Sequence, residues 1–244
     1  MIVVTADQRG STRGGADRVP EVLELLAGRA RGRPGVALPF ERTVGDEVQG
    51  VLAGDDDGAR LAVDLVLDLV RDGGWSVGIG LGPVGEPLPA TTRAASGPAF
   101  VRARDAVERA KRRGRGSVPL AVVGSGSEPR ATVAADAQAL LQLLGAVVAR
   151  RSDAGWEAVD TLVAHEGARA PQRATAAALG VSEQAVSQRL RAAQWAEEAA
   201  VRPLAARLLR AGARDDVEPA ERADGEDDGD QDDGDQDDEE ARGA

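Results

Sequence analysis

The chain has 244 residues, of which 42% are hydrophobic and 29% charged, and its formal net charge is −11. This length allows one large domain or two modest ones. The sequence has no cysteine and one histidine, which excludes disulfides, thiol nucleophiles and histidine-rich metal sites, so any bound metal ion needs oxygen ligands. The apolar stretch near residues 139–149 is too short to cross a bilayer, and the N-terminus lacks a basic region and a cleavage signal. We therefore expect a cytoplasmic protein without membrane insertion.

The negative charge is concentrated at the C-terminus. Residues 215–244 contain sixteen acidic and two basic side chains, whereas residues 1–214 carry a positive excess of three. The repeated Asp, Gly and Gln of this segment offer nothing apolar to a core, which predicts a disordered acidic tail. Two roles remain open for this tail. It either solubilises the protein or folds back over a basic DNA-binding surface and weakens non-specific binding.

Hydrophobic periodicity predicts alternating strands and helices in the first 150 residues. We expect, in chain order, a strand over 1–6, a helix over 19–30, a hairpin from 36–44 and 48–52, a helix over 59–70 and a strand over 75–81. This is the order of a ferredoxin-like sheet with helices on one face. A helix over 98–112, a strand over 118–123 and a helix over 133–150 follow. We expect the last of these to connect two domains.

Carboxylates mark the expected ends of the first strand and the hairpin. Asp7 follows the strand, and Asp46 and Glu47 lie at the hairpin tip. Because these strands pair centrally in a ferredoxin-like sheet, the three side chains are expected to meet. Hard oxygen ligands suit Mg²⁺ or Mn²⁺, so the pattern indicates a metal site for a nucleotide or other phosphate ligand. The alternative is that Asp7 caps a loop while Asp46 forms the turn.

Residues 175–193 have the spacing of a helix-turn-helix. The alanine-rich helix over 176–179 ends at Gly180, which tolerates the positive φ of a helix end, and the Ser182 hydroxyl suits the cap of a second helix. Four polar residues of this second helix follow the spacing i, i+3, i+4 and i+7, on a side away from its apolar residues. They are Gln184, Ser187, Gln188 and Arg191.

Amide, hydroxyl and guanidinium groups suit base edges and phosphates in a DNA major groove. Basic residues, Arg173 among them, outnumber acidic ones between residues 169 and 193, which favours phosphate contact. The alternative is a plain helical hairpin with a solvated polar face. Because one such helix covers only a few base pairs of double-stranded DNA, we expect a homodimer on paired half-sites.

Two further patterns indicate structural roles. Gly80, Gly82 and Gly85 satisfy G-x-G-x-x-G, but the prolines that follow prevent the helix that a dinucleotide fold needs. Gly78, Gly80 and Gly82 instead alternate onto one face of a strand, where close packing of a helix is favoured over space for a ligand. His165 lies near the end of a helix, where an imidazole meets free carbonyl groups.

Four segments, in chain order and followed by the helix-turn-helix, resemble the bacterial SatD family. They are Asp7 with Ser11 and Arg13, FERTVGDEVQ at 40–49, VGIGLG at 77–82 and GPAFVRARDA at 97–106. The hairpin and the Gly-Ile-Gly strand also resemble the palm-like sheet of class III and GGDEF nucleotide cyclases. In those enzymes, carboxylates on the first strand and hairpin hold metal ions.

The sequence also departs from these families. Gln8-Arg9-Gly10 follows Asp7, Val48 stands where the hairpin often has phenylalanine, and no base-recognising or transition-state pair is found. This implies a degenerate, ligand-sensing relative rather than an active cyclase. Arg13, Arg102 and Arg104 are candidate phosphate contacts, with a solvated charge as the alternative for each.

The sequence therefore predicts an α+β protein with four segments. These are a cyclase-like ferredoxin-type domain (1–130), a connecting helix (131–152), a helix-turn-helix DNA-binding domain (153–211) and the acidic tail (212–244). The predicted function is a DNA-binding transcriptional regulator whose sheet domain senses a ligand or metal. The alternatives are a divalent-metal-dependent enzyme that acts on nucleotides and a non-catalytic interaction scaffold.

Overall fold

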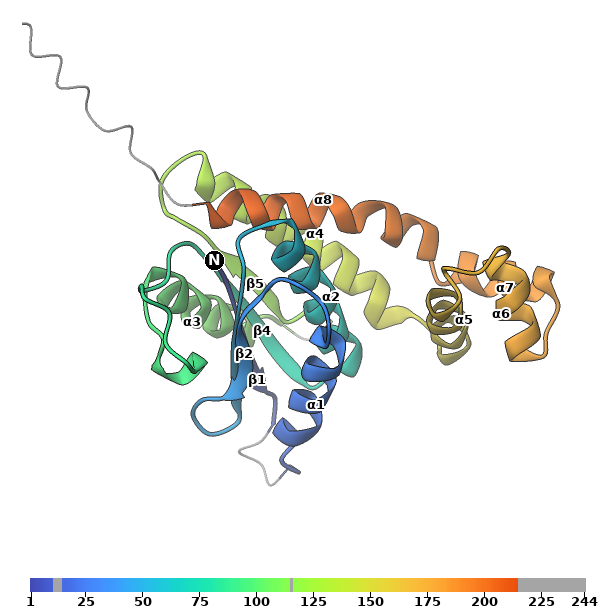
Figure 1. Ribbon diagram of the computed structural model, residues 1–244, viewed down its shortest axis with the longest axis horizontal. Helices are drawn as coiled ribbons and strands as arrows, with labels where there is room; N and C mark the ends of the chain where they lie inside the picture. Colours follow the sequence, from blue (N-terminus) through green and yellow to red (C-terminus); the bar gives the residue numbers. More distant parts are fainter. Residues whose placement is uncertain (11–14, 115, 215–244) are drawn as a thin grey trace, which may run out of the picture.

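The computed structural model describes residues 1–10, 15–114 and 116–214. Residues 215–244 of the expected acidic tail lie outside the described residues, as do Ser11 and the candidate phosphate contact Arg13. The chain is α+β, with a five-stranded mixed sheet and its helices followed by a helical region (Figure 1). The elements in chain order are β1 (Ile2–Gln8), α1 (Val19–Ala30), β2 (Val36–Arg42), β3 (Glu47–Leu52), α2 (Asp56–Asp72), β4 (Trp75–Leu81), the 3₁₀ turn η2 (Thr92–Ala94), α3 (Pro98–Lys111), β5 (Leu120–Val123), α4 (Arg130–Arg150), α5 (Asp153–Ala164), α6 (Pro171–Leu179), α7 (Glu183–Ala192) and α8 (Trp195–Ala213).

The sheet has the strand order β2-β3-β1-β4-β5. β1 lies in the middle and pairs antiparallel with β3 and β4, while β5 pairs parallel with β4 at the edge. The predicted order of strand, helix, hairpin, helix and strand is confirmed. Successive residues of β1 point to opposite faces of the sheet. Ile2 and Val4 accordingly enter the main core, whereas Val3 enters a smaller core on the other face.

Both faces of the sheet are covered, which differs from the expected placement of helices on one face. α1, α2, α4 and α8 cover one face and α3 covers the other (Figure 1). Gly80 of β4 explains why α3 fits so closely, because a Cβ there would lie 2.0 Å from the backbone oxygen of Ala99. A Cβ at Gly78 would lie 2.3 Å from the backbone nitrogen of Val107. The prediction that these glycines serve helix packing is confirmed.

α4 and α8 are part of the sheet domain's core. α4 buries Ala137, Leu141 and Leu144 in the main core, so the expected connecting helix is a packed element of that core. α8 runs back along α4 in the opposite direction and buries Leu209 there (Figure 1). The N-terminal amine of Met1 donates a hydrogen bond to the Ala213 carbonyl oxygen, 3.3 Å away. The three helices α5 to α7 are therefore held between two helices that belong to the sheet domain.

α4 is also the one helix of the described residues that is long and apolar enough to cross a membrane by length and composition. Its most apolar window has a mean hydropathy of 1.5, and 33% of that window is buried inside the protein. One such helix is weak support for a membrane protein, since the core helix of a globular domain has the same composition.

Candidate functional site

Helices α5, α6 and α7 form a small three-helix unit with its own core. This unit projects from one end of the molecule, beyond the sheet (Figure 1). Its core contains Ala158 and Val159 of α5, Ala176 of α6, and Val186 and Leu190 of α7. The predicted apolar side of the second helix is thus buried, which fixes α7 rigidly against the other two helices.

The turn between α6 and α7 has the predicted geometry. Gly180 takes a left-handed conformation with φ of 64°, which a side chain rarely adopts, and Val181 donates its backbone N–H to the Ala176 carbonyl oxygen. The Ser182 hydroxyl accepts a hydrogen bond from the Ala185 backbone N–H at 3.1 Å. Both the glycine end of α6 and the serine cap of α7 are therefore confirmed.

The predicted polar residues lie on the solvent side of this unit. Gln184, Gln188 and Arg191 of α7 are exposed, Ser187 is half-buried, and Arg173 of α6 is exposed. Among the described residues, no side chain of these five has a hydrogen-bond or ion-pair partner. We call these five residues the α7 surface. Their unpaired amide and guanidinium groups leave them available for an external partner.

A neighbouring arginine of α7 behaves differently. Arg189 turns toward α5 and forms an ion pair with Glu157, with 2.8 Å between Nη1 and Oε2. Its charge is therefore compensated within the three-helix unit. The spacing of basic residues alone did not distinguish this structural arginine from the unpaired Arg191.

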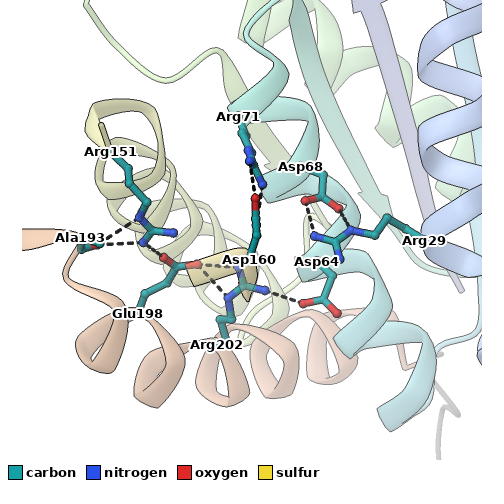
Figure 2. Close-up of polar contacts among 9 residues, drawn as sticks. All are labelled: Arg29, Asp64, Asp68, Arg71, Arg151, Asp160, Ala193, Glu198 and Arg202. Atoms are coloured by element: carbon teal, nitrogen blue, oxygen red, sulfur yellow. Dashed lines mark hydrogen bonds and ion pairs between the residues drawn. The ribbon is translucent and has the colours of Figure 1, made fainter. Parts of the chain in front are cut away.

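A buried ionic cluster lies where the three-helix unit meets the sheet domain, and sequence reasoning missed it. Arg151 donates from Nε and Nη2 to the carbonyl oxygen of Ala193, at 3.2 and 2.9 Å, directly after α7 (Figure 2). Nη2 also forms an ion pair with Glu198 of α8, and both side chains are fully buried. The guanidinium carbon lies 4.3 Å from the ring centroid of Trp156. One arginine thus connects the end of α4, α5, the end of α7 and α8.

A second set of contacts ties α2 to the three-helix unit. Arg71 of α2 donates to both carboxylate oxygens of Asp160 in α5, at 2.9 and 2.7 Å (Figure 2). Its guanidinium carbon lies 3.8 Å from the Trp156 ring centroid, so this ring contacts two arginines. Arg202 of α8 bonds to Asp64 of α2 at 2.7 Å. We call the contacts of Arg71, Arg151, Arg202 and their partners the domain junction.

The predicted carboxylates lie at one end of the sheet. Asp7 is the register partner of Glu47 across β1 and β3, and the backbone N–H of Gln8 donates to the Asp46 carbonyl oxygen at 3.3 Å. The predicted meeting of the first strand and the hairpin is therefore confirmed for the backbone. The side chains have other partners: Asp7 faces Lys111 of α3 at 2.8 Å, and Glu47 accepts from the Thr43 hydroxyl at 2.6 Å.

The side chains of these residues are not gathered into one metal-binding group in this structure. The described residues hold no group of three or more histidine, aspartate or glutamate side chains that could bind one. The ammonium group of Lys111 lies against Asp7, where a cation would have to bind, and also pairs with Glu108 at 2.9 Å. Lys111 thus supplies the positive charge beside Asp7, and the metal site at Asp7, Asp46 and Glu47 stays a prediction.

Titration of this ion pair reflects its environment. Burial raises the pKa of Asp7 above its ordinary value, and the charges of Asp46 and Glu47 add to this, while Lys111 opposes it. For Lys111 itself, burial lowers the pKa, but the bonds to Asp7 and Glu108 outweigh burial and raise it. Lys111 is therefore the group that permits a carboxylate at this position.

A pocket of about 740 Å³ opens beside this ion pair. Asp7, Asp46, Lys111 and Arg113 line it, as does Ser76 of β4. The Ser76 hydroxyl is fully buried and has no hydrogen-bond partner within the described part of the chain. Charges of both signs and an unsatisfied hydroxyl suit a small polar molecule. We call this cavity the Lys111 pocket.

The remaining predicted residues have local roles. Arg102 donates to the backbone oxygen of Leu81 at 2.6 Å and so joins α3 to β4, whereas Arg104 is exposed to solvent. His165 follows the end of α5, where its Nδ1 lies 2.8 Å from the Thr161 carbonyl oxygen, which confirms the structural prediction. The one signal that singles out the new pocket in the sequence is Lys111, the only lysine among thirty basic residues.

Comparison with known proteins returns no match, because no protein-family model, curated protein or solved structure is significantly similar to this chain. The geometry of the described residues is therefore the basis for a functional proposal. The resemblance to the SatD family stays a prediction from its motifs.

Proposed function

We propose that the protein is a DNA-binding transcriptional regulator that inserts α7 into the major groove of double-stranded DNA. The observation that carries this proposal is the α7 surface, whose four residues on α7 form a row of unpaired polar side chains on a capped helix with its opposite side buried. A helix held in this way within a three-helix unit is the geometry of a helix-turn-helix. An unpaired polar row of this kind favours a polar partner over an apolar protein surface.

Each member of the α7 surface suits a particular contact. Gln184 and Gln188 offer amides that match the N6 and N7 positions of adenine, and Arg191 offers a fork that matches guanine O6 and N7. Arg173 lies near the start of α6, where exposed backbone N–H groups and an arginine favour a phosphate. In this proposal the side chains of α7 read the bases, and the phosphate contact of α6 orients the protein on the DNA backbone.

The sheet domain supports a sensing role in the same proposal. Its first four strands follow the order β2-β3-β1-β4 with antiparallel pairs, an arrangement that supports a ferredoxin-like, nucleotide-cyclase-like domain. We infer a degenerate domain of the SatD type, in which Lys111 replaces the metal ion of an active cyclase. The Lys111 pocket is the candidate ligand site, and the domain junction holds the three-helix unit against α2 and α8.

The test begins with selection of bound sequences from random DNA by the wild-type protein. We expect Gln188→Ala and Arg191→Ala each to weaken binding to the selected site by about 1 to 3 kcal/mol and to relax base preference. Arg60→Ala is the matched control, because it removes an exposed arginine from α2 and leaves the α7 surface intact. Unchanged footprints for the Gln188 and Arg191 variants, with folding retained, would refute the proposal.

A second candidate function is handling of a nucleotide or other phosphate compound in the Lys111 pocket. The unsatisfied Ser76 hydroxyl favours it, since a buried polar group without a partner marks a place where a ligand atom would bind. Calorimetry with nucleoside triphosphates tests this, with and without Mg²⁺ or Mn²⁺. We expect metal-independent heat that is lost in Lys111→Ala. Strictly metal-dependent binding, with turnover abolished by Asp46→Asn, would instead support a metal enzyme.

A further inference from the structure

α4 has a second apolar side, opposite the one that packs on the sheet. Leu143, in the middle of the helix, is 63% exposed, although it is a large hydrophobic residue. Ala139 is exposed and Ala146 is half-buried on the same side. This explains why a helix with a mean hydropathy of 1.5 has only 33% of its most apolar window buried. An exposed leucine with small residues on either side leaves this side of the helix open to a partner.

The outward row of α4 has the spacing of a helix–helix seam. Its members alternate at intervals of three and four residues, which keeps them on one side of the helix and is typical of paired helices. They are Asp136, Ala139, Leu143, Ala146 and Arg150. We call these five residues the α4 row. Alanine on either side of Leu143 lets another helix approach closely, near the lower end of the usual 8 to 10 Å between axes.

The charges of the α4 row make it complementary to itself. Asp136 lies seven residues before Leu143 and Arg150 lies seven residues after it. Both are exposed, and neither forms an ion pair within the described residues. If two copies of α4 pack antiparallel about a two-fold axis at Leu143, Asp136 of each copy faces Arg150 of the other. A two-fold interface requires this kind of self-matching surface.

We propose that the α4 row is the interface between two copies of this chain. The leucine supplies apolar area at the two-fold axis, the alanines allow close packing, and the two aspartate–arginine pairs set the antiparallel register. A lipid surface is the other partner that an apolar helix side suits. The charged residues at both ends of the row and the small alanines between them favour a second helix over lipid.

The proposed dimer determines where its two candidate DNA-contacting units lie, a point that rests on the proposed function. At 1.5 Å per residue, the two copies of Arg150 would be separated by about 20 Å along the helix axis. Each three-helix unit lies beyond this end of α4 (Figure 1). The two α7 helices would therefore lie at opposite ends of the paired α4 helices, farther apart than the two copies of Arg150.

The size of the α4 row sets the expected strength of association. A seam made by one pair of helices buries less than the roughly 1,600 Å² of a standard stable interface. We therefore expect reversible dimers whose population rises with protein concentration. DNA with two half-sites should strengthen the dimer, since it holds both copies at a high effective concentration.

Sedimentation velocity of the full chain, without DNA, is the direct test. We expect a concentration-dependent monomer–dimer equilibrium for the wild type. Leu143→Asp should weaken association by at least about tenfold, because it places two carboxylates at the two-fold axis. Val101→Asp is the matched control, since Val101 is 71% exposed on α3, on the other side of the sheet, and should leave association unchanged.

Charge exchange tests the antiparallel register. Asp136→Arg places like charges opposite each other at both ends of the seam, as does Arg150→Asp, and each should weaken the dimer severalfold. The double variant Asp136→Arg/Arg150→Asp restores both opposite-charge pairs and should recover wild-type association. A double variant that is as weak as the single variants would contradict this register.

A cross-link locates the axis independently. Because the chain has no cysteine, Leu143→Cys introduces its only thiol. In the proposed dimer the two thiols lie at the axis, within the short range that a disulfide requires, so mild oxidation should give a covalent dimer. Val101→Cys is the control and should stay monomeric on a denaturing gel.

Three outcomes overturn the proposal. They are a wild type that stays monomeric at all concentrations, a Leu143→Asp protein that associates like the wild type, and binding of anionic lipid vesicles that Leu143→Asp abolishes while self-association is absent. Self-association is measured without DNA. A failure here is therefore distinct from a failure of the α7 surface to bind DNA.

Discussion

The domain junction and the α7 surface use arginine in opposite ways. At the junction, Arg151 and Arg202 share the carboxylate of Glu198, and Arg71 holds Asp160 while it contacts a tryptophan ring. On the three-helix unit, Arg173 and Arg191 are exposed and have no partner in the described chain. An arginine is therefore structural where a neighbouring carboxylate compensates its charge, and available for binding where none does.

Desolvation gives the physical reason for this difference. A guanidinium taken out of water costs several kcal/mol unless a carboxylate and hydrogen bonds replace the water, so Arg151 had to be paired. An exposed guanidinium keeps its hydration and its full charge, which is what a phosphate backbone attracts. The domain junction therefore fixes the orientation of α7, and the α7 surface provides the side chains that are free to contact a partner.

The largest expected effect concerns the junction. Glu198→Gln leaves the fully buried Arg151 without its carboxylate partner and should reduce the free energy of unfolding by about 3 to 5 kcal/mol. Urea denaturation measures this loss. Glu157→Gln is the control, because its ion pair with Arg189 is exposed and should contribute less than about 1 kcal/mol. Equal losses in the two variants would show that burial does not distinguish these pairs.

A smaller effect is expected at the Lys111 pocket. Lys111→Met removes the cation that faces Asp7, so the pKa of Asp7 should rise further above its unfolded value of about 4. A carboxyl whose folded pKa is raised stabilises the fold below the unfolded pKa and loses this contribution as pH rises through the folded pKa. Lys111→Met should therefore be destabilised by about 1 to 2 kcal/mol at pH 7, and by less at pH 4.

Thermal or urea unfolding at both pH values checks this prediction. The double variant Asp7→Asn/Lys111→Met contains neither charge and should regain most of the stability at pH 7. If the loss in Lys111→Met is the same at acid and neutral pH, its cause is lost packing of the lysine chain rather than an unpaired Asp7.

On the α7 surface, Arg173→Ala should weaken DNA binding without a change in stability. Removal of one phosphate contact lowers affinity by a similar factor for specific and random DNA, and reduces the slope of log affinity against log salt by about 1. Titrations at several salt concentrations measure the slope. A loss confined to the selected site would assign Arg173 to base contact instead.

The smallest expected effect is at the exposed side of the junction. Arg71→Ala removes the bonds to Asp160 and the contact with Trp156, both partly exposed to solvent. The expected loss of stability is about 1 kcal/mol or less. The fluorescence of Trp156 should change, since its ring loses one of two facing arginines. Asp160→Asn is the companion variant, and it removes the ion pair while Arg71 stays on the ring.

Much of the fold was predictable because its signals are local. The alternation of β-branched and apolar residues identified β1 and β4, and Gly180 with Ser182 identified the turn before α7. The coverage of the second sheet face was not predicted, because periodicity shows that α3 is a helix but not which side of the sheet it packs on. Gly78 and Gly80 indicated that a helix packs closely on β4, but the sequence did not show which helix it is.

The candidate sites divide in the same way. The polar row of α7 follows from the helical period, so its exposure on one side was predicted. The ion-pair partner of Asp7 was not predicted, because Lys111 lies more than a hundred residues further along the chain. The packing of α3 on the sheet brings Lys111 next to Asp7. Spacing suggested three carboxylates around a metal ion, whereas the packing of α3 supplies an ammonium group there.

Local sequence patterns predicted most of the strands and helices, the turn before α7 and the polar row of α7. These depend on intervals of two to seven residues, within which backbone geometry repeats. Long-range packing brings Arg151 to Glu198 and Lys111 to Asp7, and it places α4 and α8 in the core. Such contacts join residues far apart in the chain, and their energies depend on burial, which no local pattern encodes.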